Sequence, residues 1–169
     1  MTPHRRQFLA GLVITTTLPA ATAAAASGAF HHQRGLDYGG YLIPQGRLRV
    51  GRLYLSSVGI GDPSSFTDWE AGRRMSTWGP VVLNFSRTPD SAGSDVRVLP
   101  SAYDLSARGL SFRGTSPRLG SVSLQLTFTA EAAAIISHHE SSEHFVARGV
   151  LAAGGRRYPG LRFVYTVGD

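Results

Sequence analysis

The stretch SVSLQLTFT at residues 121–129 decides the fold class. Its apolar residues alternate strictly with hydroxyl and amide residues; the apolar ones are Val122, Leu124, Leu126 and Phe128. Successive side chains of a β-strand point to opposite faces of a sheet. The alternation therefore predicts a strand with one buried face and one solvated face.

The same alternation returns in LRFVYTV at residues 161–167. Residues 145–152 are predicted to form its hairpin partner, because the glycines and the proline between 154 and 160 favour turns. Four more strands are expected, the first with a bulge at Gly51: residues 47–55, 81–85, 96–99 and 110–113. The pattern of about eight strands predicts an all-β domain, either a single antiparallel β-barrel of the lipocalin type or a β-sandwich.

One short helix is expected at residues 62–75. Pro63 suits a first turn, Ser65 and Asp68 have the spacing of a capping box, and the arginine pair at 73–74 suits a C-terminal turn. The apolar run at 130–136 is too short for its sequence to distinguish a helical turn from a strand.

Residues 1–26 have the organisation of a cleaved signal peptide. Arg5 and Arg6, followed by Phe8 and Leu9, precede a short, weakly apolar run, and Ala-x-Ala cleavage sites follow in residues 21–26. This order resembles the twin-arginine class of bacterial export signals. It implies the twin-arginine export machinery as a partner and a periplasmic or secreted location. An ordinary secretory signal remains the alternative.

Cleavage would leave a flexible leader at residues 27–36 and a single β domain at 37–169. It would lower the formal charge from +6 to about +4, because the removed segment holds two arginines and no acid. The arginines are spread along the chain, which disfavours a nucleic-acid partner. The chain has no cysteine and no apolar run of about 20 residues, so we expect no disulfide and no permanent membrane anchor.

The segment HHESSEH at residues 138–144 concentrates possible metal ligands, namely His138, His139 and His144 with two glutamates. On a helix, residues four apart would share a face and could hold Zn²⁺. The segment lacks the His-Glu-x-x-His order of zinc proteases. The preferred interpretation is a solvated loop between strands, with no metal or other cofactor.

No catalytic constellation is evident in the sequence. The chain has no Gly-x-Ser-x-Gly motif, and its histidines lie near the amino terminus or in the 138–144 segment. Carboxylates could meet in space as in glycosidases, although their spacing does not predict it: Asp62, Asp68, Glu70, Asp90, Asp95 and Asp104. An exported hydrolase is therefore the third functional alternative, and catalysis is not the favoured one.

Two segments carry a family resemblance: GVLAAGGRRYP at 149–159 and LSFRGTS at 110–116. They resemble the YceI-like family of exported polyisoprenoid-binding proteins, although Ala152 and Arg157 stand where threonines are usual. The resemblance implies an eight-stranded, lipocalin-like barrel whose apolar interior holds an isoprenoid or fatty chain without catalysis.

An interior ligand would contact inward side chains of the last strands. Leu126 and Phe128 would form one wall, Phe163 and Tyr165 another, and the small side chain of Ala147 would leave room between them. The expected function is thus that of an exported, soluble, non-catalytic binding protein for a long apolar ligand. The alternative is a structural or partner-binding β-sandwich with a filled core.

Overall fold

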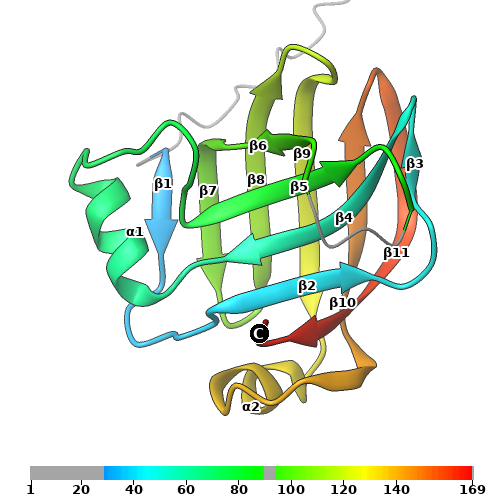
Figure 1. The fold of residues 1–169 in the computed structure, drawn as a ribbon. Helices are drawn as coiled ribbons and strands as arrows, with labels where there is room; N and C mark the ends of the chain where they lie inside the picture. Colours follow the sequence, from blue (N-terminus) through cyan, green and yellow to red (C-terminus); the bar gives the residue numbers. More distant parts are fainter. Residues whose placement is uncertain (1–28, 90–93, 169) are drawn as a thin grey trace, which may run out of the picture.

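Strands dominate residues 29–89 and 94–168, which are the residues that the computed structural model describes (Figure 1). Their all-β character confirms the predicted class. The strands are β1 (Phe30–His32), β2 (Gly40–Pro44), β3 (Arg49–Val50), β4 (Leu53–Ile60), β5 (Val81–Ser86), β6 (Val96–Val98), β7 (Pro100–Ser106), β8 (Gly109–Ser116), β9 (Gly120–Phe128), β10 (Ser142–Ala153) and β11 (Arg156–Thr166). Two helices accompany them in this part of the chain, α1 (Pro63–Glu70) and α2 (Ala132–Ser137). The predicted export signal, with Arg5, Arg6, Phe8 and Leu9, lies outside the described residues.

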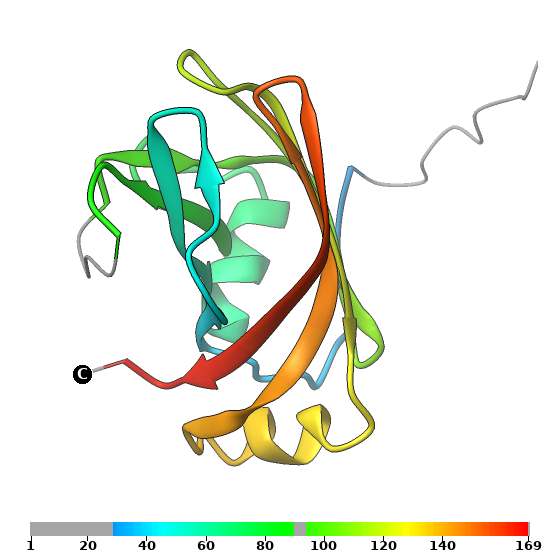
Figure 2. The same cartoon turned by 90° about the vertical axis from the view of Figure 1, so that its right-hand side faces the viewer.

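All of these strands belong to one curled sheet, in the order β1-β7-β8-β9-β10-β11-β2-β4-β5-β6, with β3 added beside β4. Only the β1–β7 pair is parallel among the pairs that the structure describes. Strands β2, β4 and β5 cross steeply over β7 to β10, and the view turned by 90° shows the sheet bent over itself (Figures 1 and 2). The result is a half-barrel with its core between the two layers.

The core follows from the alternation in the sequence. The four apolar residues of β9 are at most 8% exposed, whereas Gln125 and Thr127 between them face solvent. Strand β5 differs because it is buried along its whole length, from Val81 to Ser86. Such a strand has no period-two pattern, since side chains on both of its faces are covered.

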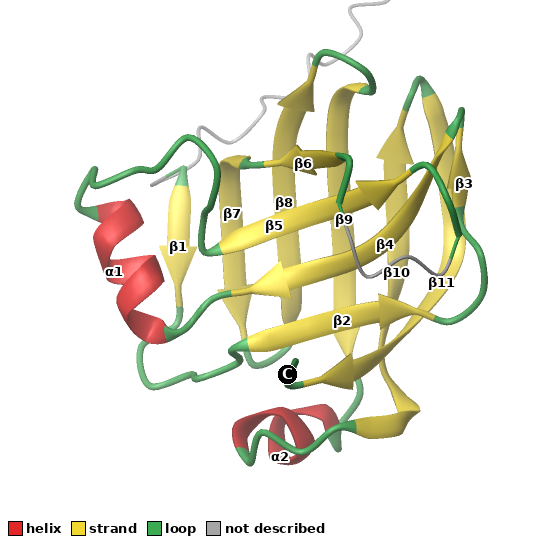
Figure 3. Cartoon of the chain, in the orientation of Figure 1, coloured by secondary structure: helices red, strands yellow, loops and turns green. Residues whose placement is uncertain are grey.

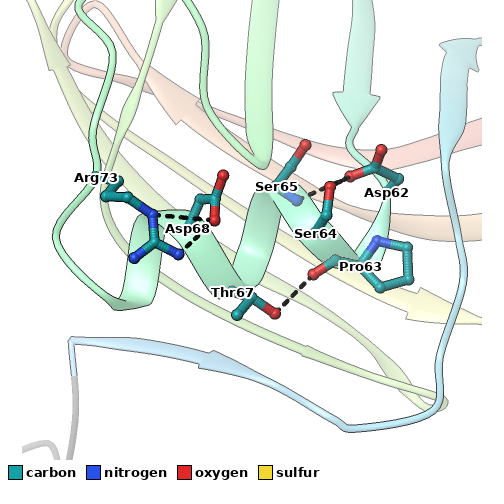
Figure 4. Close-up of polar contacts among 7 residues, drawn as sticks. All are labelled: Asp62, Pro63, Ser64, Ser65, Thr67, Asp68 and Arg73. Atoms are coloured by element: carbon teal, nitrogen blue, oxygen red, sulfur yellow. Dashed lines mark hydrogen bonds and ion pairs between the residues drawn. The ribbon is translucent and has the colours of Figure 1, made fainter.

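Helix α1 begins with a cap one turn earlier than the predicted capping box. The Asp62 carboxylate accepts hydrogen bonds from the Ser65 backbone N–H and the Ser64 hydroxyl, both at 2.8 Å (Figure 4). The helix ends at Glu70 rather than near 75, because Gly72 adopts a φ of +85°. Arg73 therefore pairs with Asp68 at 2.6 Å instead of capping a last turn.

The fold corrects two further expectations and decides one that the sequence left open. Residues 30–32 of the predicted leader form β1, which pairs with β7 through Phe30 and Tyr103. Residues 47–55 form the β3–β4 hairpin, because Gly51 with a φ of +63° makes a turn rather than a bulge. The run at 130–136, for which the sequence allowed a helical turn or a strand, is largely helical, because α2 begins at Ala132 (Figure 3).

Candidate functional site

A cavity of about 940 Å³ lies at the end of the half-barrel where three hairpins turn. The β3–β4, β8–β9 and β10–β11 turns lie at the same end of the molecule, opposite α2 (Figures 1 and 2). The described residues that line the cavity are Val50, Gly51, Arg52, Leu53, Arg87, Arg118, Leu119, Gly154, Arg156 and Tyr158. Cavities that bind small molecules have volumes of about 300–1,000 Å³. The volume therefore suits a small ligand.

Backbone contacts hold the three turns in place around this cavity. The Gly154 N–H donates a hydrogen bond to the Leu119 carbonyl at 2.9 Å, joining the β10–β11 and β8–β9 turns. Gly154 has a φ of +58°, and a Cβ on it would lie 3.6 Å from Val50 on β3. Glycine suits this position because it adopts a left-handed turn without steric cost.

The cavity has an apolar floor and a cationic rim. Val50, Leu53 and Leu119 are buried and belong to the hydrophobic core, and Tyr158 beside them is half-buried. Four exposed arginines surround this floor: Arg52, Arg87, Arg118 and Arg156. The described lining includes no carboxylate. The site thus offers apolar contact and positive charge together.

The five residues predicted to contact an interior ligand do lie together, inside the core and outside this cavity's lining. Ala147 on β10 is paired with Phe128 on β9 and with Phe163 on β11. Leu126, Phe128, Ala147, Phe163 and Tyr165 are each at most 8% exposed. The Tyr165 hydroxyl donates a hydrogen bond to the Gly39 carbonyl, and burial raises the pKa of this phenol.

The room expected beside the small residues of β10 is occupied. A Cβ on Gly149 would lie 1.9 Å from the Gln125 carbonyl oxygen and 2.7 Å from a methyl group of Leu126. Ala147 is fully buried between its two phenylalanine neighbours. Small side chains therefore allow the strands and neighbouring side chains to approach closely at these two positions.

The 138–144 segment is largely exposed, but it is more than a loop between strands. His138 caps the end of α2, and His144 lies within β10. His139 adopts a φ of +51° and places Nε2 3.5 Å from an Asp37 carboxylate oxygen. No group of three His, Asp or Glu side chains in the described residues is arranged to hold a metal ion.

The described carboxylates considered for hydrolysis each have their own partner. Asp62 caps α1, Asp68 pairs with Arg73, and Asp95 lies 3.6 Å from Arg87. The two others accept hydrogen bonds, Glu70 from the Tyr103 hydroxyl at 3.0 Å and Asp104 from His31 at 2.9 Å. Asp90 lies outside the described residues. These contacts hold elements of the fold together.

Two of these contacts also shift a pKa. Burial and the hydrogen bond to Glu70 raise the pKa of Tyr103. The Ser65 backbone N–H, followed by the Ser64 hydroxyl, lowers the pKa of Asp62. Neither group lines the 940 Å³ cavity.

Sequence reasoning missed the arginine rim. Its members lie on separate turns and strand ends, so no motif links them. A weak signal was present, since Arg52 follows Gly51, Arg118 follows Pro117 and Arg156 follows Gly155. A cation beside a turn residue is displayed at the tip of a hairpin, where several tips can meet.

Comparisons with known proteins gave no match to a family model, a curated protein or a solved structure. Within residues 29–89 and 94–168, no helix combines the length and apolar character needed to cross a membrane. The function must therefore be inferred from the chemistry of this chain's own residues.

Proposed function

We propose that this protein is an exported, non-catalytic binding protein that holds a largely apolar small molecule at the hairpin end of its half-barrel. The observation that carries the proposal is the 940 Å³ cavity with its floor of Val50, Leu53, Leu119 and Tyr158. Apolar ligands bind because contact with such a surface removes both from water. The resemblance of residues 110–116 and 149–159 to the YceI-like family supports an isoprenoid or fatty chain as the ligand.

The cavity is a better site for this ligand than the centre of the core. A chain that reached Ala147, Phe128 or Phe163 would have to replace protein contacts that already bury these side chains. At the hairpin end the space exists without such displacement. In this proposal the half-barrel is an incomplete, lipocalin-like barrel, and the five interior residues support the floor from within.

The lining also favours binding over catalysis. Apart from glycines, the described lining residues are arginines, aliphatic residues and one tyrosine. Acyl transfer needs a nucleophile beside a base, and glycoside hydrolysis needs a pair of carboxylates. The cavity offers neither arrangement, so an exported hydrolase ranks below a binding protein.

The proposal is tested by native mass spectrometry and lipid extraction of the protein purified from the periplasm of its own host. We expect an apolar molecule to co-purify with the wild type and to be lost in Tyr158→Ala. Tyr41→Ala, at a half-buried tyrosine away from the cavity, is the matched control and should keep the ligand. Removing the ligand should lower the melting temperature, because each buried CH₂ contributes about 0.8 kcal/mol.

The second candidate is a structural or partner-binding domain with a filled core. The close approach of Leu126 to Gly149 favours it, since the interior has no room at that point. Two results together would support this candidate over the first. The protein purified from its host would contain no ligand, and its melting temperature would not rise when apolar ligands are added.

We further propose that export depends on the twin-arginine pair. Arg5→Lys combined with Arg6→Lys should retain the protein in the cytoplasm, because a planar guanidinium recognition site does not accept an ammonium group equally well. The control is Arg73→Lys with Arg74→Lys, which changes an adjacent arginine pair just after α1 and should leave export intact. Normal export of the first double variant would indicate a general secretory signal.

A further inference from the structure

Three of the four arginines of the cavity rim have no counter-charge among the described residues. Arg87 lies 3.6 Å from Asp95, but the guanidinium groups of Arg52, Arg118 and Arg156 form no ion pair or hydrogen bond within the described residues. Other exposed arginines differ in this respect: Arg73 is paired with Asp68, whereas Arg148 has no side-chain partner in the described part of the chain and lies outside the cavity lining. The three rim arginines are distinguished because they line one cavity together. Three unpaired cations around one cavity create a positive potential that an anion would neutralise.

Arginine is well suited to anion recognition. Its planar guanidinium presents fixed N–H donors that match the oxygen atoms of a carboxylate or phosphate, often two at a time. Arg52 and Arg118 lie in the β3–β4 and β8–β9 turns, and Arg156 begins β11 directly after the β10–β11 turn. An anion at the mouth of the cavity could therefore be approached from three sides.

The apolar floor adds the second half of the specificity. Val50, Leu53, Leu119 and Tyr158 line the same cavity as the arginines and are less exposed than they are. A free inorganic anion would leave this floor in contact with water, and an uncharged hydrocarbon would leave the three cations without a partner. A molecule with an anionic head and an apolar chain satisfies both parts of the lining.

We propose that the cavity binds a single-chain amphiphile whose head is a carboxylate or a phosphate. Arg52, Arg118 and Arg156 bind the head, and the chain lies on the apolar floor. This inference rests on the proposed binding function and specifies the ligand class of that site.

The test is isothermal titration calorimetry of the mature protein with four probes below their aggregation concentrations: dodecyl phosphate, laurate, dodecanol and inorganic phosphate. The two anionic amphiphiles should bind at one per protein, dodecanol at least about tenfold more weakly, and inorganic phosphate most weakly. Raising the salt concentration should weaken only the anionic probes, because the rim is exposed to solvent.

The variants Arg52→Gln, Arg118→Gln and Arg156→Gln assign the head group. Each should weaken laurate and dodecyl phosphate binding by about tenfold and leave dodecanol binding unchanged, because a hydrogen bond to a charged group is lost. Arg148→Gln, at an exposed arginine of β10 outside the cavity lining, is the control and should bind all probes as the wild type does.

The outcomes separate the inference from the function on which it rests. If dodecanol binds as tightly as laurate, and the three arginine variants change nothing, the anionic head is wrong while the binding function stands. If inorganic phosphate binds as tightly as dodecyl phosphate, the chain contributes nothing and the amphiphile is wrong. If no chain-bearing probe binds at all, the proposed binding function fails as well.

Discussion

The two ends of the half-barrel differ in what covers them. At one end α2 covers the sheet with Ile136, which is fully buried, and Asp37 lies opposite His139 at 3.5 Å. The other end is the one where three hairpins turn (Figure 2). Residues of these hairpins line a cavity, and Arg52, Arg118 and Arg156 have no side-chain partner in the described residues. Strand β9 runs from the open end to α2, so the same strand contributes to both (Figure 1).

Under the proposed function, the difference separates contacts that stabilise the fold from groups that are available to a ligand. At the α2 end Ile136 is buried and His139 faces Asp37, and both contacts favour the folded state. At the hairpin end both an apolar floor and positive charge remain available to another molecule. Unsatisfied groups are common at binding sites because a ligand, rather than the fold, completes them. The substitutions below measure this difference.

The largest effect is expected at the α2 end. Ile136→Ala should lower the free energy of unfolding by about 3 kcal/mol, because it removes a fully buried aliphatic side chain and leaves a cavity. Chemical denaturation measures this loss. Ile135→Ala is the control, since Ile135 is only partly buried and its truncation should cost less. Equal losses would mean that α2 does not close this end as described.

A smaller effect is expected at the centre of the core. Ala147→Leu should destabilise the protein by about 2 kcal/mol, because added methylene groups must fit between Phe128 and Phe163. The affinity for a ligand at the hairpin end should not change. Ala152→Leu, on the same strand but half-exposed, should be tolerated. A stabilising Ala147→Leu that also expels ligand would place the binding site in the interior instead.

The cap of α1, which lies beside Gly39 just before β2, should contribute less to stability. Asp62→Ala should cost about 1 kcal/mol, because the Ser65 N–H loses its acceptor. The folded-state pKa of Asp62 is lowered, so its stabilisation is present above about pH 4 and is lost as the pH falls through the folded-state value. Asp62→Asn should keep most of the cap but lose this pH dependence. Thermal melts from pH 2 to pH 7 would distinguish the two variants.

The smallest effect on stability is expected at the arginine rim. Arg118→Gln should change the free energy of unfolding by no more than about 0.5 kcal/mol, because the exposed guanidinium has no partner in the described residues to lose. A thermal melt without ligand measures the change. A loss of 2 kcal/mol or more would show that this arginine supports the fold, and the contrast between the two ends would then disappear.

The sequence predicted the elements whose pattern is local. Strict alternation located β9 and β11, and the paired glycines at 154 and 155 located the turn between the last two strands. The remaining residues of that predicted turn, 158–160, lie within β11 instead. The helix cap was placed three residues late because Ser65 matches a capping-box pattern, whereas Asp62 is the acceptor in the structure.

The features that were missed depend on residues far apart in the chain. Strand β1 has only three residues, and its pairing with β7 joins Phe30 to Tyr103. The arginine rim joins Arg52 on the β3–β4 turn to Arg156 at the start of β11, which are far apart in the sequence. The sheet order had no local signal either, and only that order brings the three turns together. Short-range periodicity therefore predicts which residues are buried, but not which solvent-facing residues meet at a site.

The pairing of β2 with β11 has a consequence for the timing of synthesis. Residues 41–44 find their partners only at 163–166, and the hydroxyl of Tyr165 reaches back 126 positions to Gly39. At about 5–20 residues per second, a ribosome needs about 6–25 seconds to make the intervening chain. During that interval the sheet has an open seam, whereas the proposed export signal has already emerged. An export route that transports proteins after folding would move this domain only once β2 and β11 have paired.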